Sequence, residues 1–408
     1  MTISPPPRGL LGAAGFLSNF DRFSIAPMLV LIGTDLGVPF RTVALAASAY
    51  TLGYGLAQPA WGMASDRFGR VRVMRLSLAV AALGALSSAV APGAVPLIVA
   101  RGFTGACFAA AIAGSLTYVG DTVAPAGRQR ALSSLMTAFA LGTTLATVVA
   151  GALAHWAGWR LVFALPGLLA GWLALALRDL PEPVVARRDG GALRTVVRSR
   201  RQWYVMGVAL LEGGVLLGCF TCLPPAVQSL GASSTTAGAV TALYGVAAMG
   251  GAQMVRRLAG RLGPVALIVA GGAQVTLAYA VAAAHLSLVT LGMSALLLGG
   301  GWAFLHSTVQ AWATLVVPDA RASAIALFGV ALYLGSALGT SLAAGPAQHG
   351  SFQGLFGVAA ACAVPLTVLA AYGRHRFGDG GPPRRKRSRH TADRTPPSPC
   401  TGERARGL

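Results

Sequence analysis

Twelve apolar stretches, each about as long as a lipid bilayer is thick, fill the chain from Leu10 to Tyr372. A membrane-spanning helix needs roughly 20 mainly apolar residues, because each residue adds about 1.5 Å. Charged residues make up 11% of the 408 residues, whereas soluble domains carry about 25%. The sequence therefore predicts an all-α polytopic membrane protein. The expected spans are residues 10–32, 42–62, 74–91, 95–118, 131–154, 160–177, 203–224, 236–254, 264–284, 286–310, 322–345 and 352–372.

Basic residues mark one side of the predicted membrane. All lysines and arginines except Arg22, Arg41, Arg101 and Arg160 lie at the N-terminus, in every second loop or in the C-terminal tail. Short loops rich in Lys and Arg stay in the cytoplasm. Both termini are therefore predicted to be cytoplasmic. We attribute the net charge of +20 to this topology and to contact with anionic lipid headgroups, and we expect no nucleic-acid binding.

The spans fall into two similar halves. At one common offset Tyr50 aligns with Tyr244, and the intramembrane acids Asp21 and Glu212 stand almost the same distance apart. Parallel repeats of six helices are typical of rocking transporters, which bind substrate at the interface of the repeats. The predicted units are an N-terminal six-helix bundle (1–177), a basic cytoplasmic linker (178–202), a C-terminal six-helix bundle (203–373) and a disordered basic cytoplasmic tail (374–408).

The loop after the second span carries the motif that suggests a family. Residues 62–70 read GMASDRFGR, which resembles the signature loop of the major facilitator superfamily. The resemblance implies that this loop latches the cytoplasmic side. Asp66 would then meet the N-terminus of the eleventh span, and Arg70 would pair with an acid at the end of the fourth. The residues of this expected gate are Gly62, Asp66, Arg67, Gly69, Arg70 and Asp121.

Other segments resemble the drug:proton antiporter branch of that superfamily. Asp21 in the first span, followed by Pro27, is such a segment, whereas Arg101 followed by Gly105 in the fourth span resembles a pattern of the superfamily as a whole. The fifth span departs from the branch, because Ala146 and Thr147 stand where it carries Gly-Pro. The resemblance implies twelve transmembrane helices in two pseudo-symmetric six-helix bundles. It also implies a secondary active transporter, namely a proton-coupled exporter of small organic compounds that works by rocker-switch alternating access.

Four ionisable residues other than histidine lie well inside the spans: Asp21, Arg22, Arg101 and Glu212. Charges there cost at least about 2.5–3.5 kcal/mol on insertion scales and mark substrate or ion pathways. We expect Asp21 or Glu212 to pair with Arg101 or Arg22 across a central cavity. Competition between a proton, an arginine and the substrate for one carboxylate would couple transport to the proton gradient. The alternative is a structural ion pair that holds the first, fourth and seventh spans together.

Polar and aromatic side chains form two stripes, one in each half. In each stripe three residues recur at four-residue spacing and so share one helical face. Such stripes suit a cavity for an amphipathic organic molecule, and hydrogen bonding between helices is the alternative. The expected cavity-lining residues are Asn19, Tyr50, Tyr54, Gln58, Tyr244, Gln274, Trp302, His306 and Gln310.

Several other functions fit the sequence less well. Uptake by symport or facilitated diffusion agrees with the altered fifth span, and a sensor or scaffold acting through the tail is a third possibility. The sequence has no phosphate-binding loop, no clustered metal ligands and no catalytic constellation. We therefore expect no enzyme, no metal and no cofactor, with the proton gradient as energy source. Cys219 and Cys222 form C-x-x-C inside an apolar helix, where free cysteine behaves as a small hydrophobe.

Composition also suggests where the protein resides. Arginine and glycine are abundant, with 53 glycines in the chain, and this bias indicates a GC-rich bacterial genome. We expect a monomer in a bacterial inner membrane, with a small organic substrate, protons and anionic lipids as its partners.

Overall fold

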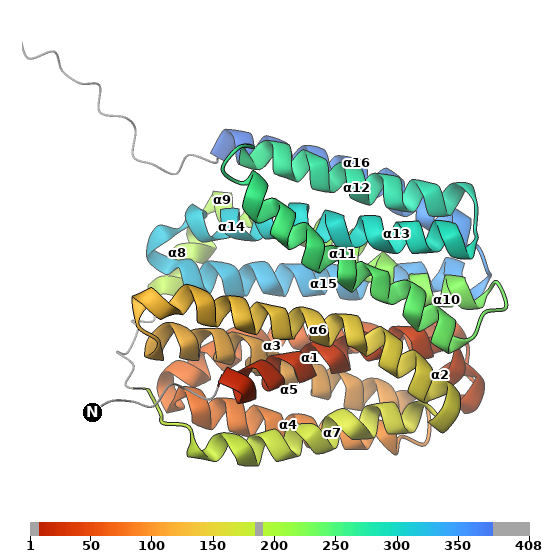
Figure 1. The fold of residues 1–408 in the computed structure, drawn as a ribbon, viewed down its shortest axis with the longest axis horizontal. Coiled ribbons are helices and arrows are strands. Elements are labelled where there is room, and N and C mark those ends of the chain that lie inside the picture. The colour runs from red at the N-terminus through yellow and green to blue at the C-terminus, as the bar shows by residue number, and fades with distance from the viewer. Residues whose placement is uncertain (1–7, 184–190, 378–408) are drawn as a thin grey trace, which may run out of the picture. The chain divides into compact units, whose positions relative to one another are not determined.

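Helices account for nearly all of the chain in a computed structural model that describes residues 8–183 and 191–377. Within those ranges no strand occurs. The helices run side by side, with α1 to α7 grouped in one part and α9 to α16 in the other (Figure 1). The predicted all-α fold is confirmed. The linker residues 184–190 and the tail beyond residue 377 lie outside the described residues.

The first half supplies six helical spans, of which the first is broken. Its elements are α1 (Arg8–Ser24), the 3₁₀ turn η1 (Ala26–Met28), α2 (Leu29–Leu36), α3 (Phe40–Phe68), α4 (Arg70–Ala89), α5 (Ala94–Thr122), α6 (Pro125–Ala157), α7 (Trp159–Ala176) and the 3₁₀ turn η2 (Leu177–Asp179).

The rest of the chain consists of a short linker helix and the second half, which contains two broken spans. Its elements are α8 (Gly191–Arg198), α9 (Arg200–Glu212), η3 (Gly213–Gly218), η4 (Cys219–Cys222), α10 (Leu223–Gln228), α11 (Ser234–Leu258), α12 (Pro264–Ala284), α13 (Leu288–Gly301), η5 (Trp302–His306), α14 (Ser307–Val316), η6 (Pro318–Ala320), α15 (Arg321–Gln348) and α16 (Phe352–Phe377).

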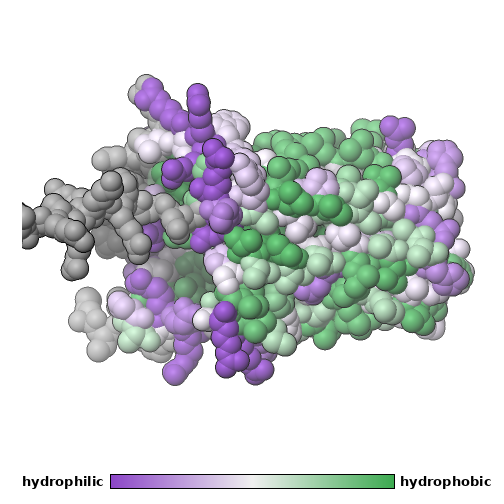
Figure 2. All heavy atoms as spheres, turned by 90° about the horizontal axis from the view of Figure 1, so that it is seen from above, coloured by the Kyte–Doolittle hydropathy of each residue, from purple (hydrophilic) through white to green (hydrophobic). Residues whose placement is uncertain are grey.

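The helices agree with the predicted spans in length and composition. Eleven helical segments in the described part of the chain are long and apolar enough to cross a membrane. The predicted second span is outside that group, although α3 has 29 residues. Polar side chains such as Tyr50, Thr51 and Gln58 lower its mean hydropathy. Figure 2 shows the resulting surface, an apolar band between two hydrophilic ends.

The two hydrophilic ends differ in charge. Arg67, Arg72 and Arg257 lie in or beside loops at the end that also carries α8, where hydrophilic residues gather most densely (Figure 2). We call it the arginine-rich end. The loops that join α2 to α3 and α10 to α11 lie at the other end (Figure 1), which we call the opposite end.

Two spans change helix type in the middle. The π-helical segment η3 begins directly after Glu212, and the π-helical segment η5 ends at His306. A π turn widens the helix locally and redirects the side chains that follow, and such turns occur frequently at functional sites. In the first span, Pro27 falls in the 3₁₀ turn between α1 and α2, because proline cannot donate the backbone hydrogen bond that an α-helix needs.

The internal repeat of the sequence reappears as a repeated helix contact. Gly105 of α5 packs against the backbone of Tyr50 in α3, and Gly299 of α13 packs in the same way against Tyr244 in α11. The offset that aligns the two tyrosines also aligns the two glycines. A side chain at either glycine would overlap the tyrosine carbonyl. Small residues let helix backbones approach closely within membranes.

Candidate functional site

A buried ion pair joins the first and fourth spans. Nη1 of Arg101 lies 3.0 Å from Oδ1 of Asp21, and both side chains have 0% exposure. The Arg101 guanidinium lies between two rings, 4.5 Å from the centroid of Tyr50 and 4.4 Å from that of Phe163. Oδ2 of Asp21 is buried with no hydrogen-bond partner in the described part of the chain. This carboxylate therefore keeps one acceptor position unfilled.

The position of Asp21 near a helix end strengthens this pair. Asp21 lies in the last turn of α1, where backbone carbonyls have no partner within the helix. Its carbonyl accepts hydrogen bonds from Nη2 of Arg101 at 2.9 Å and from Oγ of Ser24 at 2.9 Å. Arg101 thus contacts both the side chain and the backbone of Asp21. Of the pairings considered from the sequence, this is the one that the structure contains.

Arg22 follows Asp21 but faces another part of the bundle, because successive helical residues point about 100° apart. Its Nη1 donates a hydrogen bond to the hydroxyl of Tyr333 in α15, in the other half. The guanidinium carbon lies 4.6 Å from the ring centroid of Phe23, 5.4 Å from that of Tyr54 and 5.3 Å from that of Tyr333. Tyr333 was not predicted, because a single tyrosine in an apolar span carries no distinctive sequence signal.

A second buried carboxylate, Glu212, lies in the other half. Its Oε1 is 3.0 Å from Nδ1 of His306, and the Glu212 side chain has 0% exposure. The two residues sit at the edges of the two π-helical segments. The ring of Trp302 stacks on His306 with the centroids 3.8 Å apart. The sequence considered only arginine as a partner for Glu212, whereas the structure pairs it with His306.

The predicted tyrosines lie together between the two halves. Tyr50 stacks on Tyr54 with ring centroids 6.2 Å apart, and the ring centroids of Tyr54 and Tyr333 are 4.8 Å apart. On the other side, the ring of Tyr244 is 4.5 Å from that of Phe220. These rings and the two buried acids form the centre of the candidate site.

Other predicted cavity residues do not join this centre. Asn19 donates a hydrogen bond to the carbonyl of Phe139 at 2.9 Å, which is the interhelical role considered as the alternative. Gln274 donates to Ala270 in its own helix at 3.1 Å. Gln310 of α14 is exposed. Gln58 packs against Gly329 of α15, between the halves.

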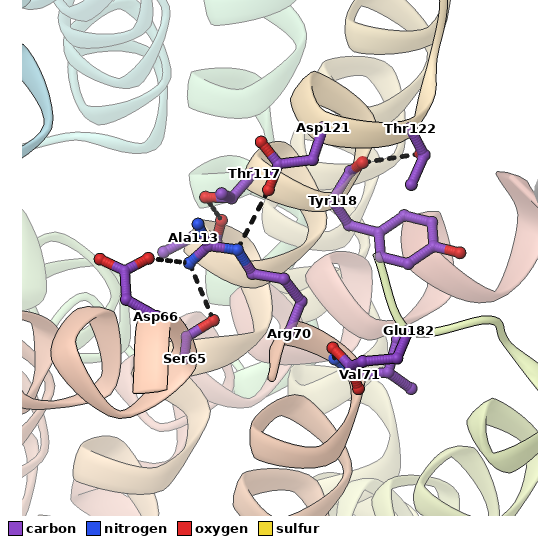
Figure 3. A network of polar contacts seen from close by, with 10 residues as sticks. All are labelled: Ser65, Asp66, Arg70, Val71, Ala113, Thr117, Tyr118, Asp121, Thr122 and Glu182. Atoms are coloured by element: carbon purple, nitrogen blue, oxygen red, sulfur yellow. Dashed lines mark hydrogen bonds and ion pairs between the residues drawn. The ribbon is translucent and has the colours of Figure 1, made fainter. Parts of the chain in front are cut away.

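The predicted gate residues form a compact polar network (Figure 3). Arg70 is 4% exposed and contacts Oδ1 of Asp66 at 2.5 Å and Oδ2 of Asp121 at 3.1 Å. It also donates to Oγ of Ser65 at 3.1 Å. Asp66 was expected to meet the N-terminus of the eleventh span. In the structure, the ion pair of Asp66 is formed with Arg70.

The remaining gate residues surround this network. Arg67 is exposed, and its guanidinium lies 5.3 Å from the ring of Phe68. Gly69 has a φ of +105°, a backbone conformation that favours glycine. Gly62 lines a small cavity of about 40 Å³ beside Arg70 and Trp61.

Glu182, which the sequence interpretation missed, binds the start of α4 (Figure 3). Its Oε1 accepts the N–H of Val71 at 3.0 Å, and its Oε2 accepts that of Arg72 at 3.2 Å. The first N–H groups of a helix lack partners within the helix, and a carboxylate there is stabilised by the helix dipole. A Cβ at Gly69 would lie only 2.7 Å from this carboxyl group. The sequence signal was weak, because Glu182 is one of three acids in a linker that is basic overall.

We expect Glu182→Ala to lower the free energy of unfolding by about 0.5–2 kcal/mol, as loss of a helix cap does. Thermal unfolding in detergent measures the effect. The control is Asp179→Ala, because Asp179 is 81% exposed in its pair with Arg178, and exposed pairs contribute little. Equal unfolding temperatures for the two variants would contradict the capping role.

Hydrogen bonds connect the two halves near the opposite end. Nε2 of Gln228 donates to the carbonyl of Pro27 at 3.0 Å, and Oγ of Ser234 donates to that of Gly151 at 3.0 Å. A cavity of about 670 Å³ opens nearby, lined by residues of α2, α10 and the end of α15. No cluster of three or more metal-ligating side chains occurs in residues 8–183 and 191–377.

Comparison with known sequences identifies relatives of this chain. The sequence profile of the Major Facilitator Superfamily matches residues 11–340 and 221–404. The multi-drug resistance efflux pump PmrA of Streptococcus pneumoniae is 26% identical over 354 residues, covering 83% of this chain and 88% of PmrA. A D-xylose transporter of Levilactobacillus brevis is 31% identical over 176 residues, covering 43% of this chain and 38% of that protein.

Some similarities cover only part of the relative. A triacylglyceride transporter of Mycolicibacterium hassiacum is 31% identical over 140 residues, which are 34% of this chain and 26% of that protein. The chain thus spans about a quarter of that relative's length.

Solved structures share the fold. The nucleoside transporter NupG superposes with a TM-score of 0.73 at 14% identity, covering 90% of this chain and 98% of NupG. A bacterial homologue of the human lysosomal transporter Spinster, in an inward-facing and unoccupied conformation, superposes with a TM-score of 0.74 at 16% identity. The similarity covers 93% of this chain and 99% of that homologue. The predicted architecture of twelve helices in two six-helix bundles is thus the fold of these transporters.

Proposed function

The chain belongs to the Major Facilitator Superfamily, and from this membership we propose that it exports small organic compounds in exchange for protons. Its relatives and structural neighbours are membrane transporters. The protein is accordingly an integral membrane transporter of small solutes and not an enzyme. The direction of transport and the coupling to protons are the parts that we propose.

The buried pair of Asp21 and Arg101 carries the proposal. Burying two charges costs several kcal/mol per ion, and a buried ion pair is weak evidence for stability. Asp21 also keeps a free carboxylate oxygen, to which a proton can bind. Protonation would weaken the attraction of Asp21 for Arg101 and so couple proton binding to the contact between α1 and α5. Glu212 offers a second carboxylate with a free oxygen, in the other half.

Export is supported by the similarity to PmrA, which covers most of both chains. Uptake or facilitated diffusion is the second candidate. The partial similarity to a D-xylose transporter favours this second candidate. Ala146 and Thr147 also favour it, because they stand in α6 where the antiporter branch carries Gly-Pro. The vesicle experiment below distinguishes the two directions.

The charge distribution supports an orientation in the membrane. We propose that the arginine-rich end faces the cytoplasm, with both termini and the linker, since Lys- and Arg-rich loops remain there. Anionic lipid headgroups would bind this end. We further propose a monomer in a bacterial inner membrane, with residues 1–177 and 203–373 as the two bundles that pivot.

Contacts between the halves support a conformational assignment. Interhelical hydrogen bonds from Gln228 and Ser234 close the opposite end. At the arginine-rich end, Asp66 pairs within its own half. We therefore propose that the structure represents the state closed at the opposite end. The similarity to an inward-facing Spinster homologue agrees with this assignment.

Gly238→Ala is expected to disfavour this state by about tenfold. Gly238 of α11 packs against the backbone of Thr147 in α6, with no room for a Cβ. Overpacking costs about 1–3 kcal/mol, and about 1.4 kcal/mol corresponds to tenfold. Spin labels on the exposed residues Val90 and Leu230, at the opposite end, report its opening. Gly250→Ala is the matched control, since its Cβ would meet open space, and equal distance distributions for both variants would contradict the assignment.

The function is tested in proteoliposomes that contain a pH-sensitive dye. A panel of lipophilic cations, organic anions and neutral metabolites is added under an imposed proton gradient. Proton movement that depends on a substrate and runs opposite to its flux supports export by antiport. Movement in the same direction indicates symport, and flux without proton movement indicates a facilitator.

A further inference from the structure

Arg22 is a cation without an acid partner in the part of the chain that the structure describes. Its hydrogen bond goes to the neutral hydroxyl of Tyr333, and Nε is buried with no hydrogen-bond partner. Part of the residue remains accessible. Since a guanidinium carries several N–H donors in a fixed fork, the side chain has capacity to bind another group.

The other ionisable groups of the centre are paired. Asp21 binds Arg101, and Glu212 binds His306. Rings of Phe23, Tyr54 and Tyr333 surround Arg22, and their faces attract a cation. They cannot accept its N–H groups as a carboxylate would, so the charge of Arg22 stays uncompensated by an anion.

Arg22 also lies where the two halves meet. It belongs to α1, and its ring partners come from α1, α3 and α15. Phe23 further contacts Tyr244 of α11, with ring centroids 6.5 Å apart. A molecule bound here would touch both halves, as a transported substrate must in alternating access.

We infer that Arg22 and the rings of Phe23, Tyr54 and Tyr333 form a subsite for an aromatic organic anion. A carboxylate or sulfonate would bind the guanidinium, which matches planar oxyanions in two-pronged fashion. The flat body of the molecule would pack against the surrounding rings. A lipophilic cation is disfavoured, because it would meet a charge of the same sign. This inference rests on the proposed transport function and names its substrate class.

The test compares three probes of the same shape: naphthoate, its neutral analogue naphthamide, and the cation naphthylmethylammonium. Equilibrium dialysis against the full chain in lipid nanodiscs measures their dissociation constants, with empty nanodiscs as the blank. We expect the wild type to bind naphthoate at least about tenfold more tightly than naphthamide, because hydrogen bonds between charged groups are the stronger ones. Naphthylmethylammonium is expected to bind most weakly.

Arg22→Gln should remove the preference for naphthoate, and Arg22→Lys should retain part of it because the charge remains. The matched control is Arg257→Gln, which removes a positive charge from an exposed position at the arginine-rich end and should leave the preference unchanged. Thermal unfolding identifies the variants that are folded. If Arg22→Gln is unfolded, Arg22→Lys replaces it as the test variant.

Two results would overturn the inference. One is equal binding of the three probes by the wild type, absence of binding included. The other is a naphthoate preference that persists in Arg22→Gln. Failure of this inference can be distinguished from failure of the proposed function. Proton-coupled flux of cations alone would refute the anion subsite and leave the antiporter intact, whereas naphthoate binding at Arg22 without proton-coupled flux would do the reverse.

Discussion

Asp21→Asn is expected to abolish proton-coupled transport and to destabilise the protein. The amide leaves Arg101 as an uncompensated charge at a site with 0% exposure. Removal of one partner from a buried pair costs about 3–5 kcal/mol, mainly because the other charge stays buried. Because the carboxylate proposed to bind the proton is lost, we expect substrate-dependent proton movement to fall by at least about a hundredfold, as loss of a proton-transfer group does. Dye-loaded proteoliposomes measure transport, and thermal unfolding measures stability.

A double variant separates coupling from structural support. Asp21→Asn combined with Arg101→Gln removes both charges, and glutamine keeps an N–H donor although it is two heavy atoms shorter than arginine. Since no unpaired ion remains, most of the lost stability should return. Proton-coupled transport should stay absent, because the carboxylate proposed to bind the proton is gone. Recovery of proton-coupled transport in the double variant would instead show that the pair only holds α1 and α5 together.

The chain offers a matched control for this experiment. Asp35 pairs with Arg160 at 2.5 Å, but the two side chains are 43% and 47% exposed. Exposed pairs contribute about 0–1 kcal/mol. Asp35→Asn should therefore change the unfolding temperature only slightly and leave proton coupling as in the wild type.

Glu212→Gln is expected to uncouple transport from protons with little loss of stability. Glutamine has nearly the shape of glutamate and keeps an oxygen that can contact Nδ1 of His306, and a neutral hydrogen bond contributes about 1 kcal/mol. The carboxylate that could exchange a proton with His306 is lost. Proton-transfer groups typically contribute about 100-fold or more to a rate. We therefore expect substrate-dependent proton movement to fall by at least about tenfold.

His306→Gln tests whether the two residues act as one unit. If they share a proton, both single variants and the double variant should show the same loss of proton movement, since effects within one unit do not add. Additive losses would mean separate roles. If Asp21→Asn and Glu212→Gln both leave pH-dependent transport intact, proton coupling through these carboxylates is wrong.

Particular residues show what sequence reasoning found and what it missed. Asp21 and Glu212 were identified because a charge inside an apolar stretch is conspicuous without any structure. The contact of Arg70 with Asp121 followed from a motif. Tyr333 gave no signal, since its role depends on which face of α15 meets α1. In the stripe predicted from Trp302, His306 and Gln310, the first two rings stack on each other, whereas the π-helical segment Trp302–His306 shifts the helical register before Gln310.

The sequence by itself determined the spans, their alternation and the charge asymmetry between the two ends. Span length and local charge are properties of contiguous residues, and the bilayer acts on them directly. Only the tertiary structure decided which buried charges meet. Helix rotation, π turns and close glycine contacts bring Arg101 to Asp21 and His306 to Glu212, and they leave Arg22 among aromatic rings. Such pairings depend on the relative placement of helices far apart in the chain, which no local pattern encodes.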